Sequence, residues 1–267
     1  MNPEQLTQKI ILIAQEAGSF ISEQRKSFRP EDVVEKGRYD YVSHIDKDTE
    51  LFLIERLSAL LPEAGFISEE GQAGYRGEEY CWIVDPLDGT TNYIHDFAPY
   101  CVSIALRKGD TVLIGVVYEI CRRECFYAWK GGGAYLNGTP IHTSRTTETE
   151  KSFIGIGLPY NYAKYRALAD DIIPGFYGSC MGIRLTGSAA ANLCYVAAGR
   201  YDFWFEAHIY LWDFAAGARI VQEAGGTVTG FDSNPDYALS HHIIASSNGV
   251  LHQKALEFIS VHNDKIL

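Results

Sequence analysis

The sequence lacks any run of about eighteen apolar residues, so it predicts no membrane-spanning helix. Residues 1–25 are polar and amphipathic, without the apolar centre of a secretory signal peptide. The six cysteines form no C-x-x-C pair, and four of them lie within apolar runs. This pattern predicts reduced, mostly buried thiols, and we therefore expect a cytoplasmic protein.

Basic residues are also scarce, with 23 Lys and Arg against 34 Asp and Glu and a net charge of −11. This balance argues against direct binding to nucleic acid and to anionic membranes. Two nucleotide-binding patterns are missing as well. No G-x-G-x-x-G follows the first expected strand, which disfavours a dinucleotide-dependent dehydrogenase, and the G-x-x-x-x-G-K-[ST] of a P-loop kinase does not occur.

The remaining composition is that of a globular enzyme. The 267 residues are enough to bury a full core as one large domain or as two closely joined halves. A Thr/Glu-rich stretch near 146–151 reads as a linker, which predicts an N-terminal half over 1–145 and a C-terminal half over 146–267 within one catalytic unit. Strand-like and helical segments come in blocks, which favours a layered α+β architecture.

Periodicity and turn residues predict the individual elements. Helices are expected over 3–27, 46–61, 162–173, 188–198, 211–224 and 250–261. Strands are expected over 65–68, 81–84, 100–107, 111–118, 124–129, 153–157 and 201–205, and near 227 and 243. Residues 29–39, which are rich in charge and include Gly37, are expected to form a mobile loop.

The most informative segment is residues 82–93, WIVDPLDGTTNY, in which an apolar strand runs into two carboxylates. Asp85 and Asp88 are separated by Pro86, which stiffens the turn, and are followed by Gly89, which lets the backbone approach a ligand. Asp88 is placed to cap a helix that starts near Thr90, and a helix N-terminus attracts phosphate. Hard oxygen ligands beside an anion site indicate Mg²⁺-dependent phosphoryl transfer. The alternative is an ordinary surface turn, in which Asp, Pro and Gly are common.

Other acidic residues lie at the ends of expected elements. Glu69 closes one strand as Asp85 closes another, Asp213 begins a helix, and Asp46 begins the second helix. Each of them alone is explained equally well as a helix cap or a solvated charge. Their combination favours a shared cation site.

Five motifs together resemble the inositol monophosphatase family, within the lithium-sensitive, magnesium-dependent phosphatase superfamily. The family signature W-I-[VI]-D-P-[LI]-D-G-T-x-N matches residues 82–92, and W-D-x-A-[AG]-[GA] matches residues 212–217. Further matches are FISEE at 66–70, GAYLNG at 133–138 and GIRLTGSAA at 182–190. The resemblance covers nearly the whole chain. It implies an α/β/α/β/α sandwich of the sugar-phosphatase type, a homodimer, inhibition by lithium, and a small phosphate monoester as substrate.

The resemblance also implies a ligand set for two to three Mg²⁺ ions. One ion would be held by Glu69, Asp85 and the backbone carbonyl of Leu87. A second would lie between Asp85, Asp88 and Asp213, and a third, weaker ion would lie near Glu69. Asp85 would therefore bridge two ions.

The family's substrate-handling residues match further positions. Thr90, paired with Asp46, would orient the attacking water, and these two act with Glu69 in catalysis. Phosphate would rest on the metals and on the N–H groups of Gly89 and Thr90. Lys36 lies where the family has a mobile lysine. The residues expected to meet the alcohol are Gly187, Ser188, Ala189 and Glu206.

One departure and several alternatives remain. Ser43 stands where many relatives have a Thr shortly before the position of Asp46. The leading interpretation is hydrolysis of myo-inositol monophosphate. The same scaffold also hydrolyses fructose 1,6-bisphosphate, histidinol phosphate or adenosine bisphosphates, and the motif reads the phosphate rather than the alcohol. Some bacterial relatives also act as regulatory binding proteins in transcription and RNA processing, which leaves a protein-binding role as a second interpretation.

Overall fold

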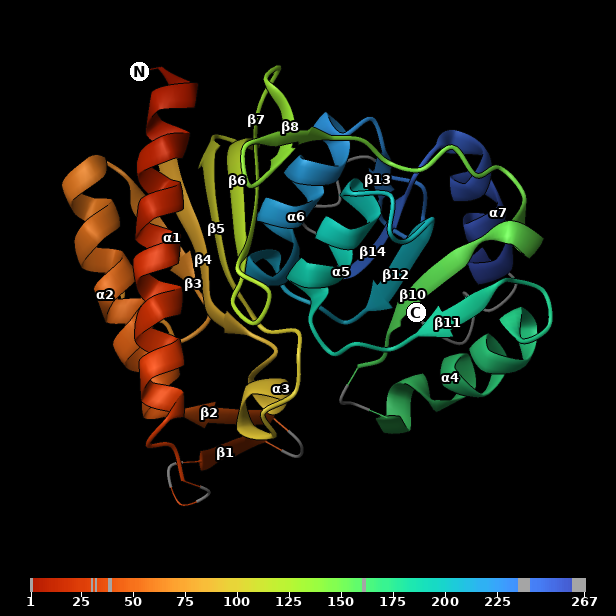
Figure 1. The fold of residues 1–267 in the computed structure, drawn as a ribbon, viewed down its shortest axis with the longest axis horizontal. Coiled ribbons are helices and arrows are strands. Elements are labelled where there is room, and N and C mark those ends of the chain that lie inside the picture. The colour runs from red at the N-terminus through yellow and green to blue at the C-terminus, as the bar shows by residue number, and fades with distance from the viewer. Residues whose placement is uncertain are drawn as a thin grey trace.

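The computed structural model describes residues 2–29, 31, 33–37, 40–159, 162–234 and 241–260. Five layers follow one another across the molecule: a helix pair, a seven-stranded sheet, a second helix pair, a five-stranded sheet and outer helices (Figure 1). Mixed sheets layered with helices confirm the predicted α+β sandwich.

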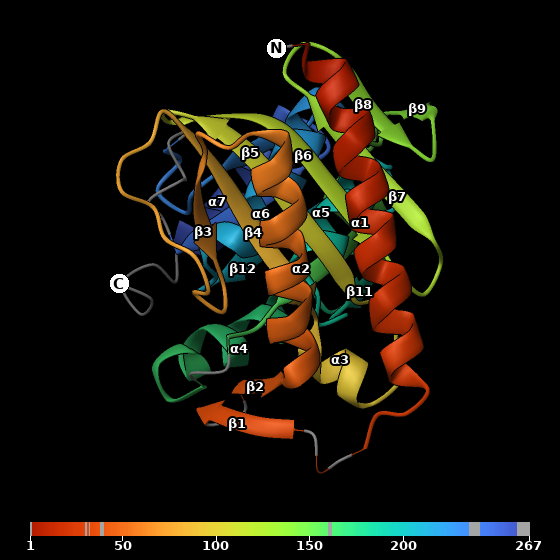
Figure 2. The ribbon, with the colours of Figure 1, turned by 90° about the vertical axis from the view of Figure 1, so that its left-hand side faces the viewer.

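The first layer consists of α1 (Pro3–Arg25) and α2 (His44–Leu60). The Asn2 side chain accepts hydrogen bonds from two backbone N–H groups of the first turn and thereby caps α1. Both helices lie side by side across one face of the large sheet (Figure 2). Their apolar stripes join the core beneath, which includes the fully buried Ile10, Ile21 and Leu53.

The large sheet has the strand order β3-β4-β5-β6-β7-β8-β9. Only the β3/β4 pair is parallel, and the other neighbouring strands form an antiparallel meander, in which β8 and β9 were not among the expected strands. The residues before Asp85 are continuously apolar because β4 is covered by helices on both of its faces. The strands are β3 (Gly65–Ser68), β4 (Tyr80–Asp88), β5 (Cys101–Lys108), β6 (Thr111–Glu119), β7 (Glu124–Trp129), β8 (Gly133–Leu136) and β9 (Thr139–Ile141).

The central layer consists of α5 (Ala189–Ala197) and α6 (Leu211–Glu223), which contact both sheets. Small residues allow this close packing. A side chain on Gly115 of β6 would collide with the carbonyl of Ala216 on α6, and one on Gly217 would meet Leu193 of α5. Residues of the C-terminal half are thus built directly onto the sheet of the N-terminal half.

The second sheet has the order β11-β10-β12-β14-β13. Its outer face is covered by α4 (Tyr162–Phe176) and α7 (Gly249–Ser260), where Phe176 packs on Phe203 and Phe258. The last strand of the large sheet ends at Ile141, and the first strand of the second sheet begins at Phe153. The division of the chain into 1–145 and 146–267 stays a prediction. The strands are β10 (Phe153–Gly157), β11 (Gly182–Arg184), β12 (Phe203–Ala207), β13 (Thr227–Thr229) and β14 (His242–Ser246).

The expected loop over 29–39 is wrong in part. The structure has β1 (Val33–Gly37) paired antiparallel with β2 (Asp40–Ser43), while positions 30, 32, 38 and 39 lie outside the described residues. Val33-Val34 and Tyr41-Val42 have β propensity, and this outweighs the charge and Gly37. Lys36 lies in β1.

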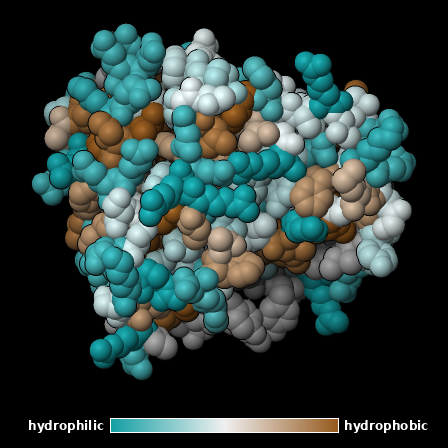
Figure 3. All heavy atoms as spheres, in the orientation of Figure 1, coloured by the Kyte–Doolittle hydropathy of each residue, from teal (hydrophilic) through white to brown (hydrophobic). Residues whose placement is uncertain are grey.

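The surface shown in Figure 3 is mostly hydrophilic, with apolar side chains scattered over it. Within the described part of the chain, no helix is both long enough and apolar enough to span a bilayer. All six cysteines are free thiols, and four of them are buried. Cys180 is partly buried, and Cys121, in the β6–β7 connection, is exposed.

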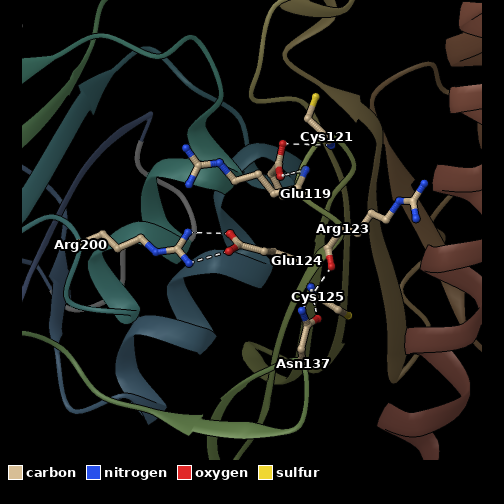
Figure 4. A network of polar contacts seen from close by, with 8 residues as sticks. Glu119, Cys121, Arg123, Glu124, Cys125, Asn137 and Arg200 are labelled. Carbon is tan, nitrogen blue, oxygen red and sulfur yellow. Dashed lines mark hydrogen bonds and ion pairs between the residues drawn. The ribbon is translucent and has the colours of Figure 1, made fainter.

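That connection takes part in a polar network that joins the two halves of the chain (Figure 4). Glu119 accepts hydrogen bonds from the backbone N–H groups of Cys121 and Arg122, which fixes the turn. Glu124 then pairs with Arg200, from the connection after α5, through two bonds of 2.6 and 2.7 Å. Two parallel bonds give the pair a defined orientation as well as charge attraction.

Candidate active site

A β-bulge brings Asp85 and Asp88 into one region. In the β4/β5 pair, Asp85 lies opposite Ser103 and Asp88 lies opposite Cys101, so a step of three residues on β4 faces a step of two on β5. Such bulges bend a strand and re-aim its side chains. Both carboxylates are buried, and Asp85 accepts a hydrogen bond from the backbone N–H of Leu87 at 3.0 Å.

Asp88 caps a different helix from the one expected. The short α3 (Thr90–Ile94) begins after Gly89, at φ 90°, without any side-chain cap. Asp88 instead accepts hydrogen bonds from the Ser188 hydroxyl and, at 2.9 Å, from the backbone N–H of Ala190 at the start of α5. Burial raises the pKa of Asp88 to about 6, and the Ser188 bond opposes that rise.

Asp46 and Thr90 form the expected pair. The α2 helix begins two residues earlier than predicted, with Ser43 as its N-cap and Asp46 at the third helical position. Asp46 Oδ2 accepts from the backbone N–H and the hydroxyl of Ser43 at 2.8 and 2.7 Å. Thr90 Oγ1 lies 3.1 Å from Asp46 Oδ1 and 3.0 Å from the carbonyl oxygen of Leu87, so its single proton has two acceptors.

Glu69 is held in place by a buried glutamate that the motif analysis missed. Glu50, on α2, has no exposed surface and accepts from the Ser68 hydroxyl at 2.8 Å. It also accepts from the backbone N–H groups of Glu70 and Gln72 at 2.8 and 2.7 Å. These bonds hold the chain on both sides of Glu69, so the direction of Glu69 depends on Glu50. The sequence signal that could have identified Glu50 is its position on the apolar side of α2, beside Leu53.

Asp213 and Glu206 enter from the C-terminal half. Asp213 lies in the first turn of α6, where its Oδ2 accepts from the backbone N–H of Tyr210 at 2.6 Å. Glu206, on β12, lies opposite Gly157 of β10, and a side chain at Gly157 would occupy the place of the Glu206 carboxylate. Burial, with a smaller effect from the charge of Asp88, raises the pKa of Glu206 to about 8.

The carboxylates gathered from these elements interact electrostatically. The pKa of Asp85 is raised well above its usual range, first by burial and then by the negative charges of Glu69, Asp88 and Asp213. A hydrogen bond with Glu69 also favours the protonated form of Asp85. The pKa of Asp213 is raised chiefly by burial, with added repulsion from Asp88, Glu69 and Glu206. Glu69, Asp85, Asp88 and Asp213 are therefore close enough to interact, whereas Asp46 is linked to them through Thr90.

This donor set suits a hard divalent cation. Buried, mutually repelling carboxylates lose their repulsion when a cation is added, and oxygen ligands are those that Mg²⁺ prefers. In the arrangement seen, Asp85, Asp88 and Asp213 accept from N–H or O–H donors. Within the described ranges, no three His, Cys, Asp or Glu side chains are arranged to hold an ion as they stand. Each of these bonds uses one oxygen of its carboxylate, so the side chains would have to reorient, without losing every protein donor, to hold an ion together.

The remaining candidate residues line the junction between α3 and α5. Gly89 and Gly187 both have positive φ, and a side chain on Gly89 would come within 3.3 Å of the Gly187 carbonyl oxygen. Asn92, also unassigned by the sequence, donates from Nδ2 to the carbonyls of Pro99 and Thr186 at 2.7 Å each. Ser188 and Ala189 are buried at the start of α5, whereas Gly187 is exposed.

Comparison with known proteins identifies the family of the chain. The model of the inositol monophosphatase family matches residues 2–263. The chain belongs to this family. It is 40% identical over 227 residues to the inositol-1-monophosphatase of Synechocystis sp., covering 83% of this chain and 78% of that protein. It is 37% identical over 242 residues to Nus factor SuhB of Escherichia coli (strain K12), covering 89% of this chain and 90% of that protein.

The fold of this family is shared in detail. A solved structure, the IMPase of Thermotoga maritima, superimposes with a TM-score of 0.87 at 31% identity, covering 96% of this chain and 97% of that one. Membership supports a phosphatase of the inositol monophosphatase family, and that family is generally dependent on Mg²⁺. One of these relatives is named as an inositol monophosphatase and another as a Nus factor.

Proposed function

We propose that this chain hydrolyses myo-inositol monophosphate to inositol and phosphate with two to three Mg²⁺ ions per active site. The observation that carries the proposal is the group of carboxylates around the buried Asp85, in which Glu69, Asp88 and Asp213 each raise the pKa of Asp85. Ionised together, these groups would hold Mg²⁺ with the Leu87 carbonyl. Bound Mg²⁺ supplies a water of lowered pKa and spreads the charge of the phosphoryl group.

The protein groups around this centre have separate tasks. Asp46 orients the Thr90 hydroxyl, whose lone pairs then hold the attacking water in position. Gly89 has no side chain to obstruct the phosphate, and the backbone N–H groups of Gly89 and Thr90 donate to it. Glu206 contacts a hydroxyl of the alcohol, and burial raises the pKa of its carboxyl group to about 8 in the metal-free protein. The backbone of Gly187, Ser188 and Ala189 borders that alcohol.

The test is phosphate release from myo-inositol 1-phosphate, fructose 1,6-bisphosphate, histidinol phosphate and adenosine 3′,5′-bisphosphate, each with Mg²⁺ and with a chelator. We expect the highest kcat/KM with the inositol ester and no turnover with the chelator. Asp85→Asn should reduce kcat/KM by about 100-fold or more, since it removes a charge from the cation site. Asp110→Asn, at the exposed β5–β6 turn, is the matched control and should retain activity.

The same variants give a readout that is independent of turnover. Mg²⁺ should raise the melting temperature of the wild type, because a ligand that binds the folded state stabilises it. Asp110→Asn should keep this rise and Asp85→Asn should lose it. A near wild-type rate of Asp85→Asn at saturating Mg²⁺ would refute its bridging role. We also propose a cytoplasmic homodimer inhibited by millimolar-scale lithium, to be tested by sedimentation and by inhibition assays.

A second candidate is a regulatory role through protein partners. It is favoured by the 37% identity to a relative named Nus factor SuhB. The net charge of −11 favours a protein partner over direct contact with nucleic acid. A cellular phenotype of the deletion that Asp85→Asn still complements would support this role, and failure to complement would favour the catalytic one.

A further inference from the structure

Asn92, in the short helix α3, belongs to the motif at 82–92 but has no task in the proposed reaction. Its side chain donates from Nδ2 to two backbone carbonyls, those of Pro99 and Thr186, at 2.7 Å each. Since a carbonyl only accepts hydrogen bonds, the group that faces both carbonyls must be the NH2 of the amide. One side chain of the N-terminal half therefore binds a segment that lies 94 positions further along the chain.

The segment bound in this way is the turn that leads into α5. Gly187 has φ 77°, in the left-handed region, and a Cβ on it would lie 3.1 Å from Oδ1 and 3.3 Å from Nδ2 of Asn92. Thr186 is also held from the other side, because its hydroxyl donates to Oδ1 of Asn192 on α5. The turn at 186–187 thus lies directly against the amide of Asn92.

The same contacts join the phosphate side of the candidate site to its alcohol side. A Cβ on Gly89, whose N–H group is proposed to bind phosphate, would lie 3.1 Å from the carbonyl oxygen of Pro99 and 3.3 Å from that of Gly187. Asn92 binds the first of these carbonyls and the carbonyl of the residue just before Gly187. Gly89, Pro99 and Gly187 are therefore gathered around one amide side chain.

The candidate metal site is anchored independently of this amide. Ser188 donates to the Asp88 carboxylate and accepts from the backbone N–H of Ala191, so it stays at the start of α5 without help from Asn92. The partners of Nδ2 of Asn92 are neutral carbonyls. Removal of the amide should loosen the turn at 186–187 and leave the carboxylates in place.

We propose that Asn92 is a positioning residue that holds the 186–187 turn against Gly89 and thereby fixes the alcohol half of the substrate relative to its phosphate. The inference rests on the proposed phosphatase function and adds a residue that determines selectivity between alcohols. Because Asn92 acts through the backbone of Thr186 and Gly187, its loss should weaken the binding of a large polyhydroxylated alcohol more than that of a small one.

The experiment compares myo-inositol 1-phosphate with glycerol 2-phosphate, whose alcohol is smaller. Asn92→Leu keeps the approximate shape of the side chain without its donors, and Asn92→Ala removes both. In each variant we expect kcat/KM for the inositol ester to fall about tenfold, chiefly through KM, and that for the glycerol ester to fall no more than about threefold. A merely structural role would lower both values alike. The Mg²⁺ concentration for half-maximal rate should not change, because the carboxylates keep their own partners.

A second variant reaches the same contact from the opposite side. The added Cβ of Gly187→Ala would press on the Asn92 amide, so this variant should show the same selective loss even if Asn92→Leu does not fold. In the double variant Asn92→Leu/Gly187→Ala, the loss for the inositol ester should be smaller than the two single losses combined, since both act on one contact.

Asn248→Ala is the matched control. The Asn248 amide also donates to a distant backbone carbonyl, that of Thr146 at 2.6 Å, and its Oδ1 caps α7 on the outer face of the second sheet. This variant should lose stability without changing the ratio of the two esters. Equal losses for both esters in Asn92→Leu and Gly187→Ala, or fully additive losses in the double variant, would overturn the inference. Failure of the wild type to release phosphate from the inositol ester would reject the proposed function itself.

Discussion

Ser188 donates a hydrogen bond from its hydroxyl to the Asp88 carboxylate, although the two residues are 100 positions apart in the chain. The same hydroxyl oxygen accepts from the backbone N–H of Ala191 at 3.2 Å and so caps α5. One side chain therefore begins a central helix and also orients a carboxylate of the candidate metal site. The two halves of the chain meet at this point.

Replacing this serine should affect both stability and pH dependence. Ser188→Ala removes a helix cap and a buried donor, which costs about 1–3 kcal/mol of unfolding free energy. It should also raise the pKa of Asp88, because the Ser188 bond lowers it. The acid limb of Mg²⁺-dependent activity should then move to higher pH. Urea unfolding and a pH–rate profile measure the two effects.

A serine on α1 provides the control. Ser19 is exposed and donates only to the Gln15 carbonyl within its own helix, so Ser19→Ala should stay within about 0.5 kcal/mol of the wild type. A Ser188→Ala protein with unchanged stability would show that the bond to Asp88 contributes nothing net.

The Arg200–Glu124 pair should contribute more than an ordinary surface ion pair. The two side chains are 33% and 17% exposed, and the guanidinium also lies over the rings of Phe126 and Tyr195 at 5.6 and 5.3 Å. Arg200→Ala is expected to cost about 1–2 kcal/mol in urea unfolding, because it loses packing as well as two charge-assisted bonds. Arg200→Lys should recover only part of this, since an ammonium cannot form the paired bonds.

An exposed pair elsewhere gives the comparison. Lys151 and Glu148 are 67% and 55% exposed, and Lys151→Ala should cost no more than about 0.5 kcal/mol. If Arg200→Ala and Lys151→Ala were equally mild, the joining of the two halves would not depend on this pair.

Much of the fold was predictable from local sequence, whereas the roles of the candidate site residues come from the resemblance to the family and stay predictions. The run before Asp85 reads as a buried strand, and the helix at 211–224 agrees with α6 to within a residue. The partner of Asp88 was not predictable, because its choice of α5 over α3 depends on tertiary packing. Glu50 was not predicted for a similar reason. A glutamate on a helix is usually solvated, and only the folded chain buries Glu50 against residues 68–72.

Glu206 should make the metal-free protein sensitive to pH. Its pKa of about 8 lies above the ordinary 4.5, so between these values the folded state holds a proton that the unfolded state has lost. This contribution to stability therefore falls as pH rises from 4.5 to 8 and changes little outside that window. Glu206→Gln cannot ionise, so with a chelator present its stability gain over wild type should be at least about 1 kcal/mol larger at pH 8 than at pH 4.5. Urea titrations at both values measure it, and a pH-independent difference would contradict the raised pKa.

Gly157 should be required for the position of Glu206 rather than for the fold of β10. The two residues lie opposite each other in the β10/β12 pair, and an added Cβ would overlap the Glu206 carboxylate. We expect Gly157→Ala to displace that carboxylate and to lower kcat/KM for myo-inositol 1-phosphate by about tenfold, since small misplacements in an active site are costly. Gly74→Ala, where an added Cβ meets nothing within 4 Å, should behave as the wild type. The double variant Gly157→Ala/Glu206→Ala separates the causes: if displacement of Glu206 is the whole effect, it should be no slower than Glu206→Ala alone, whereas a further loss would mean that Gly157 supports the strand itself.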